Sequence, residues 1–153
     1  MATLKRIYRF HFSNERRERL FLASVGFVLT FAIVRTITYL IRAGVGPFHN
    51  VISGGLHIHH LVWGIILLLL VGYVWLIEVG TGSNWLASVT AIAYGIAAAL
   101  TLDEFALWLN LQDVYWAKQG KVSIDIAIGL VALGATFFVA IPIVRRLRHD
   151  RQA

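Results

Sequence analysis

Residues 57–80 read HIHHLVWGIILLLLVGYVWLIEVG. After the histidines, this stretch is almost wholly apolar over about the 20 residues that a helix needs to cross the hydrocarbon core of a bilayer. Lipid offers the backbone no hydrogen-bond partners, so a segment of this kind crosses the membrane as an α-helix. The stretch therefore predicts a membrane helix that begins in a cluster of imidazoles.

Three further apolar segments have a similar length: 20–42, 85–111 and 122–144. Hydrophobic residues form 58% of the chain, well above the roughly 45–50% apolar content of soluble domains. The connections are short, so consecutive helices should pack antiparallel. The sequence thus predicts an all-α polytopic membrane protein, an up-down bundle of four transmembrane helices forming a single membrane domain over residues 1–153. The absence of cysteine excludes disulfides and thiol chemistry.

Basic residues are concentrated at the two ends of the chain. An arm over residues 1–19 and a tail over 145–153 hold most of them: Lys5, Arg6, Arg9, Arg16, Arg17, Arg19, Arg145, Arg146, Arg148 and Arg151. Because cytoplasmic segments carry an excess of Lys and Arg, we expect both termini in the cytoplasm. The basic ends are expected to touch membrane lipids. They adjoin membrane helices, so nucleic-acid binding is not expected.

The predicted topology brings charged residues together near the outer ends of the helices. Asp103 and Glu104 lie in the third apolar segment, and Arg35 lies at a similar depth in the first. Each such group costs about 2.5–3.5 kcal/mol in the membrane, even on the lenient insertion scale. They should therefore neutralise one another, bind a cation or titrate. Arg35 is the expected charge partner, and a purely structural ion pair is one alternative.

If the helix starts at residue 57, the spacing of the histidines places them on different faces of it. His57 and His60 are three residues apart and share a face. His59 lies about 200° from His57 around the axis, so we expect it to point toward the membrane interface instead.

Imidazoles and carboxylates together are suitable ligands for zinc, iron or manganese. We predict that His57, His60 and Glu104 bind a divalent transition metal, with Asp103 as the catalytic general base or as a partner of a ligand. Additional candidates are His59, His49 in the outer loop, and Asp125. The alternative for Asp125 is a favourable charge in the first turn of the fourth helix, after an N-cap at Ser123.

Three functions remain open on this evidence. The first is metal-dependent chemistry on a lipid-soluble substrate, which leaves open whether the protein is an enzyme. The second is an ion or proton transporter or channel subunit that uses the same polar cluster, built as a homo-oligomer because four short helices enclose little volume. The third is a structural or accessory membrane subunit.

Two blocks of the chain, LHIHHLVWGI at 56–65 and LTLDEFALWLNLQDVYW at 100–116, resemble those of a set of small integral membrane proteins common in actinobacteria. The resemblance covers the second and third predicted helices and the loop after them. It implies a four-helix, multi-pass protein of the bacterial inner membrane. The resemblance implies no activity, so the predicted metal site is inferred only from the types and spacing of its residues.

Overall fold

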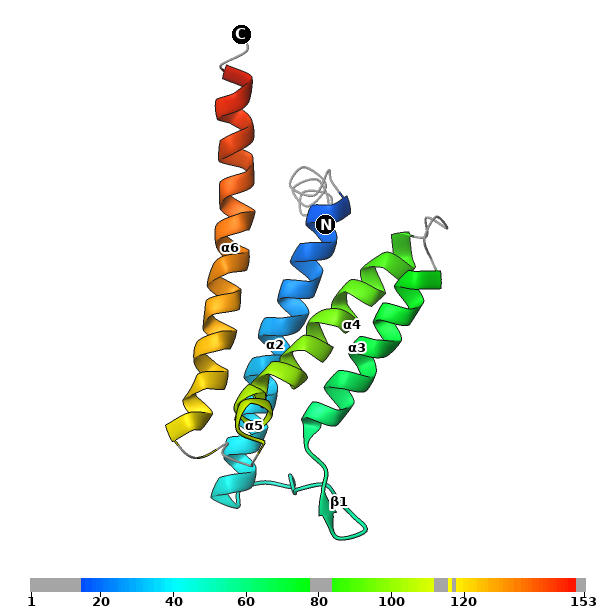
Figure 1. The fold of residues 1–153 in the computed structure, drawn as a ribbon, viewed down its shortest axis with the longest axis vertical. Helices are drawn as coiled ribbons and strands as arrows, with labels where there is room; N and C mark the ends of the chain where they lie inside the picture. The colour runs from blue at the N-terminus through cyan, green and yellow to red at the C-terminus, as the bar shows by residue number, and fades with distance from the viewer. Residues whose placement is uncertain (1–14, 78–83, 112–115, 117, 151–153) are drawn as a thin grey trace.

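The computed structural model describes residues 15–77, 84–111, 116 and 118–150, with side chains in the last helix as far as Ala135 (Figure 1). The chain is mostly helical, so the all-α class is confirmed. Its helices are α2 (Glu15–Ala43), α3 (His60–Ile77), α4 (Asn84–Asp103), α5 (Phe105–Asn110), the short 3-10 turn η1 (Lys118–Gly120) and α6 (Lys121–Asp150). Two short antiparallel strands, β1 (Ile52–Ser53) and β2 (Leu56–His57), precede α3.

Within the described residues, three helices are long and apolar enough to cross a membrane: Glu15–Ala43, His60–Ile77 and Trp85–Asp103. The fourth predicted span, 122–144, falls in α6 and runs past the side chains that are described. A bundle of four spanning helices therefore stays a prediction. The predicted basic arm up to residue 14, the side chains of the tail up to residue 150, and residues 151–153 lie outside the described part.

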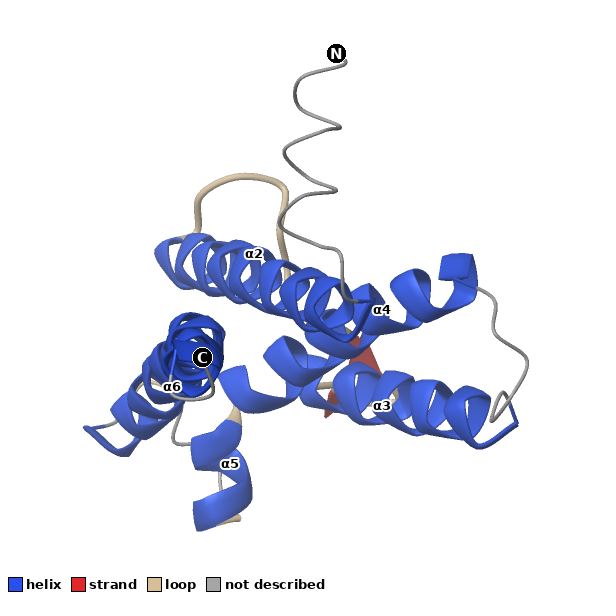
Figure 2. Ribbon diagram, turned by 90° about the horizontal axis from the view of Figure 1, so that it is seen from above, coloured by secondary structure: helices blue, strands red, loops and turns tan. Residues whose placement is uncertain are grey.

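Helix α4 is the centre of the molecule. It lies between α2 and α3 (Figure 2), and its most extensive contact is with α2, followed by that with α3. Helix α6 contacts α4, α5 and α2 more sparsely. We expected helices consecutive in sequence to be packing neighbours, but α4 separates α2 from α3. The arrangement therefore differs from a simple sequential bundle.

Small residues explain why α4 takes the central position. A Cβ added at Gly95 would collide with the carbonyl oxygen of Ala23 on α2, and one added at Gly64 on α3 would lie 2.8 Å from the backbone nitrogen of Thr101. Ala97 and Ala99 are completely buried. Membrane helices associate through such close backbone approach, because lipid supplies no hydrophobic drive. Gly64 and Gly95 therefore allow α3 and α2 to pack closely against α4.

The surfaces that face away from α4 are strongly apolar. Large side chains such as Ile33 (57% exposed), Leu69 (68%) and Leu76 (77%) lie on the outside of α2 and α3. In α2, the one buried residue within Glu15–Ala43 is Gly26. Apolar exposure on this scale suits a protein that lipid surrounds.

The second predicted helix starts later than expected. Residues 52–57 form a hairpin whose turn is Gly54–Gly55, and both glycines have positive φ, 57° and 80°. Glycine adopts this conformation without steric cost, so the chain reverses direction here and α3 begins only at His60. The prediction that His57 lies on a helix was wrong, because the two glycines favour a turn over a helical start.

The third predicted helix, 85–111, is interrupted at Glu104, which separates α4 from α5. The backbone N–H of Ala106 at the start of α5 donates to the hydroxyl of Ser123 on α6, at 2.9 Å. An N-cap at Ser123 was one of two alternatives for this segment, but α6 already begins at Lys121. Ser123 instead accepts a hydrogen bond from the first turn of a neighbouring helix.

We predict that Gly95→Ala destabilises the protein, because its methyl group would collide with backbone rather than with a flexible side chain. Overpacking of this kind costs about 1–3 kcal/mol. Gly72→Ala in α3 is the matched control, since no heavy atom lies within 4 Å of a Cβ there. Thermal unfolding in detergent should give a lower unfolding temperature for Gly95→Ala and an unchanged or higher one for Gly72→Ala. Equal unfolding temperatures for the two variants would contradict the packing described.

Candidate functional site: a buried histidine–carboxylate network

Asp103, the last residue of α4, is completely buried and connects two other helices. Its carboxylate forms an ion pair with Arg35 of α2, and the same guanidinium donates to the Asp103 carbonyl at 3.0 Å. The other carboxylate oxygen accepts from Nε2 of His60 on α3, at 3.1 Å. The sequence prediction that Arg35 is a charge partner is confirmed. A buried carboxylate needs such partners, because burial alone strongly disfavours its charge.

Glu104, the next residue, is 4% exposed and faces the start of α3. One carboxylate oxygen accepts from Nδ1 of His59 at 2.7 Å, and the other accepts from the backbone N–H of Leu61 at 3.0 Å. The first N–H groups of a helix have no partner within it and carry partial positive charge. Glu104 therefore caps α3 from the turn between α4 and α5, and this contact fixes the position of the histidines.

His60 has both ring nitrogens turned toward carboxylates. Nε2 lies 3.1 Å from Asp103, and Nδ1 lies 3.7 Å from the oxygen of Glu104 that also accepts from Leu61. A neutral imidazole carries one N–H and one lone pair, whereas the protonated ring donates from both nitrogens. His60 therefore lies between two carboxylates, with a hydrogen bond to Asp103 and a longer ion-pair contact with Glu104.

The structure reverses the predicted roles of the other two histidines. His59 was expected to point toward the interface, but it hydrogen-bonds Glu104 and its side chain is only 20% exposed. His57, expected as an inward metal ligand, is an exposed residue of β2 whose ring lies 4.5 Å from that of His59. The prediction failed because helical angles do not apply before residue 60.

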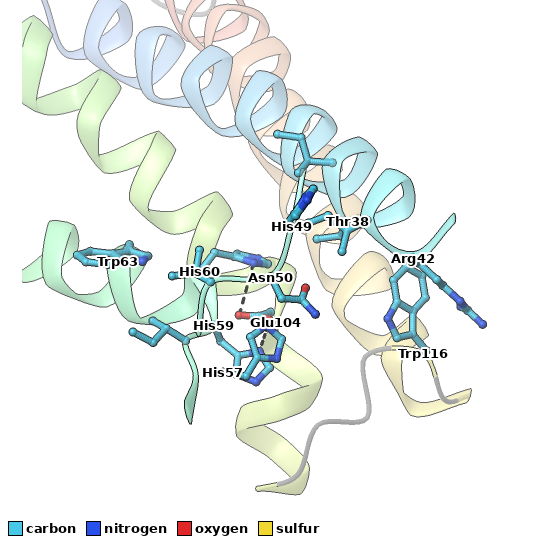
Figure 3. A pocket seen from close by; sticks show the side chains of 14 residues that line it. Thr38, Arg42, His49, Asn50, His57, His59, His60, Trp63, Glu104 and Trp116 are labelled. Atoms are coloured by element: carbon cyan, nitrogen blue, oxygen red, sulfur yellow. Dashed lines mark hydrogen bonds and ion pairs between the residues drawn. The ribbon is translucent and has the colours of Figure 1, made fainter. Parts of the chain in front are cut away.

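A pocket of about 450 Å³ opens beside the network, between the end of α2, the loop after it and the start of α3. Glu104, His57, His59 and His60 line one side of it, as Figure 3 shows. Arg42 and Trp116 lie on the opposite side, where the guanidinium is 4.2 Å from the centre of the indole ring. Further lining residues include His49, Asn50 and Trp63.

The structure brings together only some of the predicted site residues. Arg35, Asp103, Glu104, His59 and His60 form one connected network. His49 lies at the pocket wall, and its predicted role as an additional ligand is untested. Asp125 is an exposed residue of α6 beyond the first turn, which contains no acidic residue, and it is not among the residues that line the pocket. The alternative that Asp125 is a first-turn charge does not hold either, because α6 starts earlier than predicted.

No group of three or more His, Cys, Asp or Glu side chains in the described part of the chain has an arrangement that could hold a metal ion. The carboxylates instead face Arg35, the imidazoles and the Leu61 N–H. The structure therefore gives the predicted metal set of His57, His60 and Glu104 no support.

Sequence reasoning missed the far side of the pocket. Neither Arg42 nor Trp116 was among the predicted site residues. In the structure Trp116 packs edge-on against Tyr39, with ring centres 5.3 Å apart, and Arg42 covers its ring. The residues are far apart in sequence, and no periodicity connects them, so only the fold could have paired them.

We predict strong coupling between Arg35 and Asp103. Arg35→Met or Asp103→Asn alone should each cost about 3–5 kcal/mol, because each leaves a buried charge without its partner. The double variant should lose clearly less stability than the sum of the losses in the two single variants. Thermal or denaturant unfolding in detergent measures all three.

Arg19→Ala is the control, since its ion pair with Glu15 is exposed and such pairs are worth about 0–1 kcal/mol. If the stability losses of the two single variants simply added up in the double variant, Arg35 and Asp103 would not be coupled, which would contradict this prediction.

Comparison with known proteins gives no family for this chain: no protein-family model, no curated protein and no solved structure matches it.

Proposed function

We propose that this chain is an integral membrane protein whose histidine–carboxylate network binds and releases a proton, as part of an ion or proton transporter or channel. The observation that carries the proposal is the position of His60, with one ring nitrogen 3.1 Å from Asp103 and the other 3.7 Å from Glu104. Intramembrane acids and histidines of this kind are typical of proton relays.

The charge balance of the network supports uptake of one proton. Arg35 contributes one positive charge, and Asp103 and Glu104 contribute two negative charges, so neutral imidazoles leave a net charge of about −1. One additional proton on an imidazole brings the sum to zero. A neutral cluster is the less costly state in a medium of low dielectric constant. Histidine is the side chain that exchanges a proton in the physiological range.

The network also has a route for the proton. Asp103 is fully buried, whereas the side chains of His59 and His60 are 20% and 22% exposed and line the pocket. A proton entering from the pocket reaches an imidazole or Glu104 before it reaches Asp103. Successive contacts then connect His59 to Glu104, Glu104 to His60, and His60 to Asp103.

A metal ion is the second candidate because imidazoles and carboxylates bind divalent cations, although no group of three or more such side chains in the described residues has the arrangement of a metal site. The Nδ1 atoms of His59 and His60 approach different oxygens of Glu104, at 2.7 and 3.7 Å. A metal would require both imidazoles to present lone pairs rather than N–H groups to the shared centre. The hydrogen bonds described would then have to be exchanged for metal bonds, and this is why we favour the proton.

The proposal includes the orientation of the chain in the membrane. The start of α2 and the end of α6 lie toward the same end of the molecule, opposite the pocket (Figure 1). This agrees with both termini lying in the cytoplasm of a bacterial cell and with the pocket opening outward. Homo-oligomer formation stays a prediction of the sequence.

We predict that proteoliposomes containing this protein conduct protons and that Glu104→Gln lowers the flux at least about tenfold. The amide retains the shape of the side chain but cannot carry the negative charge that holds the proton. A pH-sensitive dye trapped inside the vesicles measures the flux under an imposed potential.

Asp125→Asn is the matched control, because it makes the same chemical change at an exposed position away from the pocket. Flux should persist after treatment with a metal chelator. Equal proton flux in wild type and Glu104→Gln would contradict the proposal. Loss of flux after chelation, with recovery on addition of zinc, would favour the metal candidate.

A further inference from the structure

The pocket beside the network has the size and composition of a small-molecule site. Its volume of about 450 Å³ lies within the roughly 300–1,000 Å³ of typical ligand sites. Apolar side chains such as Ile37, Ile41 and Val51 form much of its wall. A few polar groups converge on it, which is the usual pattern of a site that orients a mainly apolar ligand.

Hydrogen-bonding groups lie on opposite sides of this pocket. His57 and His59 are on one side, and Arg42 is on the other beside Trp116 (Figure 3). The guanidinium provides N–H donors only, and imidazoles provide donors in either charge state. A ligand that fits between them needs a hydrogen-bond acceptor at each end.

The charges of the lining residues disfavour a cationic ligand. Arg42 contributes one positive charge and Glu104 one negative charge, and the proton proposed for His60 adds a second positive charge. A neutral molecule meets no such repulsion.

The position of the pocket favours a ligand that dissolves in the membrane. It lies where α2 ends and α3 begins, and both are helices of membrane-spanning length and composition. Trp63, on the first turn of α3, is 54% exposed and lines the pocket, and Trp116 is 42% exposed. Aromatic side chains at the membrane interface combine an apolar face with a polar edge, and they favour contact with a flat ring.

We infer that this pocket binds the head ring of a lipid-soluble quinone. A quinone is planar and neutral, and its two carbonyl acceptors lie at opposite ends of the ring, in agreement with donors on two sides of an apolar site. The inference deepens the proposed function, since His59, His60 and Glu104 belong to both. It concerns binding alone and assigns no electron transfer to this chain.

Tryptophan fluorescence provides a direct test in the purified full-length protein, because quinones quench indole emission at short range. Titration with a short-tailed benzoquinone should give saturable quenching in the wild type. Arg42→Gln should weaken binding roughly tenfold or more, the loss typical of a charged hydrogen bond. Val51→Phe, which adds bulk at a half-exposed wall residue without touching the network, should weaken binding similarly.

Trp85→Phe is the control, because Trp85 is a 73% exposed residue at the first turn of α4, at the end of that helix remote from Glu104. It should lower total emission and leave the saturation concentration unchanged. Quenching that rises linearly with quinone, identical in wild type, Arg42→Gln and Val51→Phe, would overturn the inference. So would saturable binding of phosphatidylglycerol, but not quinone, that requires Arg42, since it would assign the pocket to an anionic headgroup.

These outcomes separate the inference from the proposed function. Quinone binding depends on Arg42 and Val51, whereas proton flux depends on Glu104. Absence of quinone binding with Glu104-dependent flux refutes only the inference. Saturable quinone binding with flux unaffected by Glu104→Gln refutes only the proton proposal.

Discussion

The adjacent carboxylates of Asp103 and Glu104 hold the three membrane-length helices together at one end. Asp103 reaches Arg35 on α2 and His60 on α3, and Glu104 binds the first turn of α3. Because α4 separates α2 from α3, these two residues connect helices that otherwise have little contact. A buried acid is costly in lipid, and here each cost is offset by a partner on another helix. The polar network is therefore part of the fold as well as the candidate site.

The interruption between α4 and α5 gives the two acids their different roles. In a continuous helix, neighbouring side chains point about 100° apart and could not both reach partners around α3 equally well. The helix instead ends at Asp103, and Glu104 lies in the turn before α5. The new helix start is satisfied by Ser123 from α6. The geometry of the network thus depends on a contact with α6, which packs against α4 more sparsely than α2 and α3 do.

Much of this arrangement follows from the sequence, and the rest depends on two local features. The helical class, the convergence of Arg35 with the two acids, and the close approach at Gly64 follow from apolar length, the cost of buried charge and residue size. The pairing of the histidines was wrong, because Gly54 and Gly55 form a turn that moves His57 off the helix. His59 then contacts Glu104, and His60 contacts Asp103 and Glu104. Helical spacing counted from residue 57 could not predict these contacts. The contact of Arg42 with Trp116 depends on tertiary packing alone.

The proposed function requires that His60 holds an additional proton between Asp103 and Glu104. Nuclear magnetic resonance of the protein with isotope-labelled histidine nitrogens tests it most directly, because it distinguishes a ring with two N–H groups from a ring with one. At neutral pH we predict two N–H groups on His60 in the wild type and one in Glu104→Gln, with His49 the same in both proteins. A His60 ring with a single N–H in the wild type, unchanged by Glu104→Gln, would contradict the account.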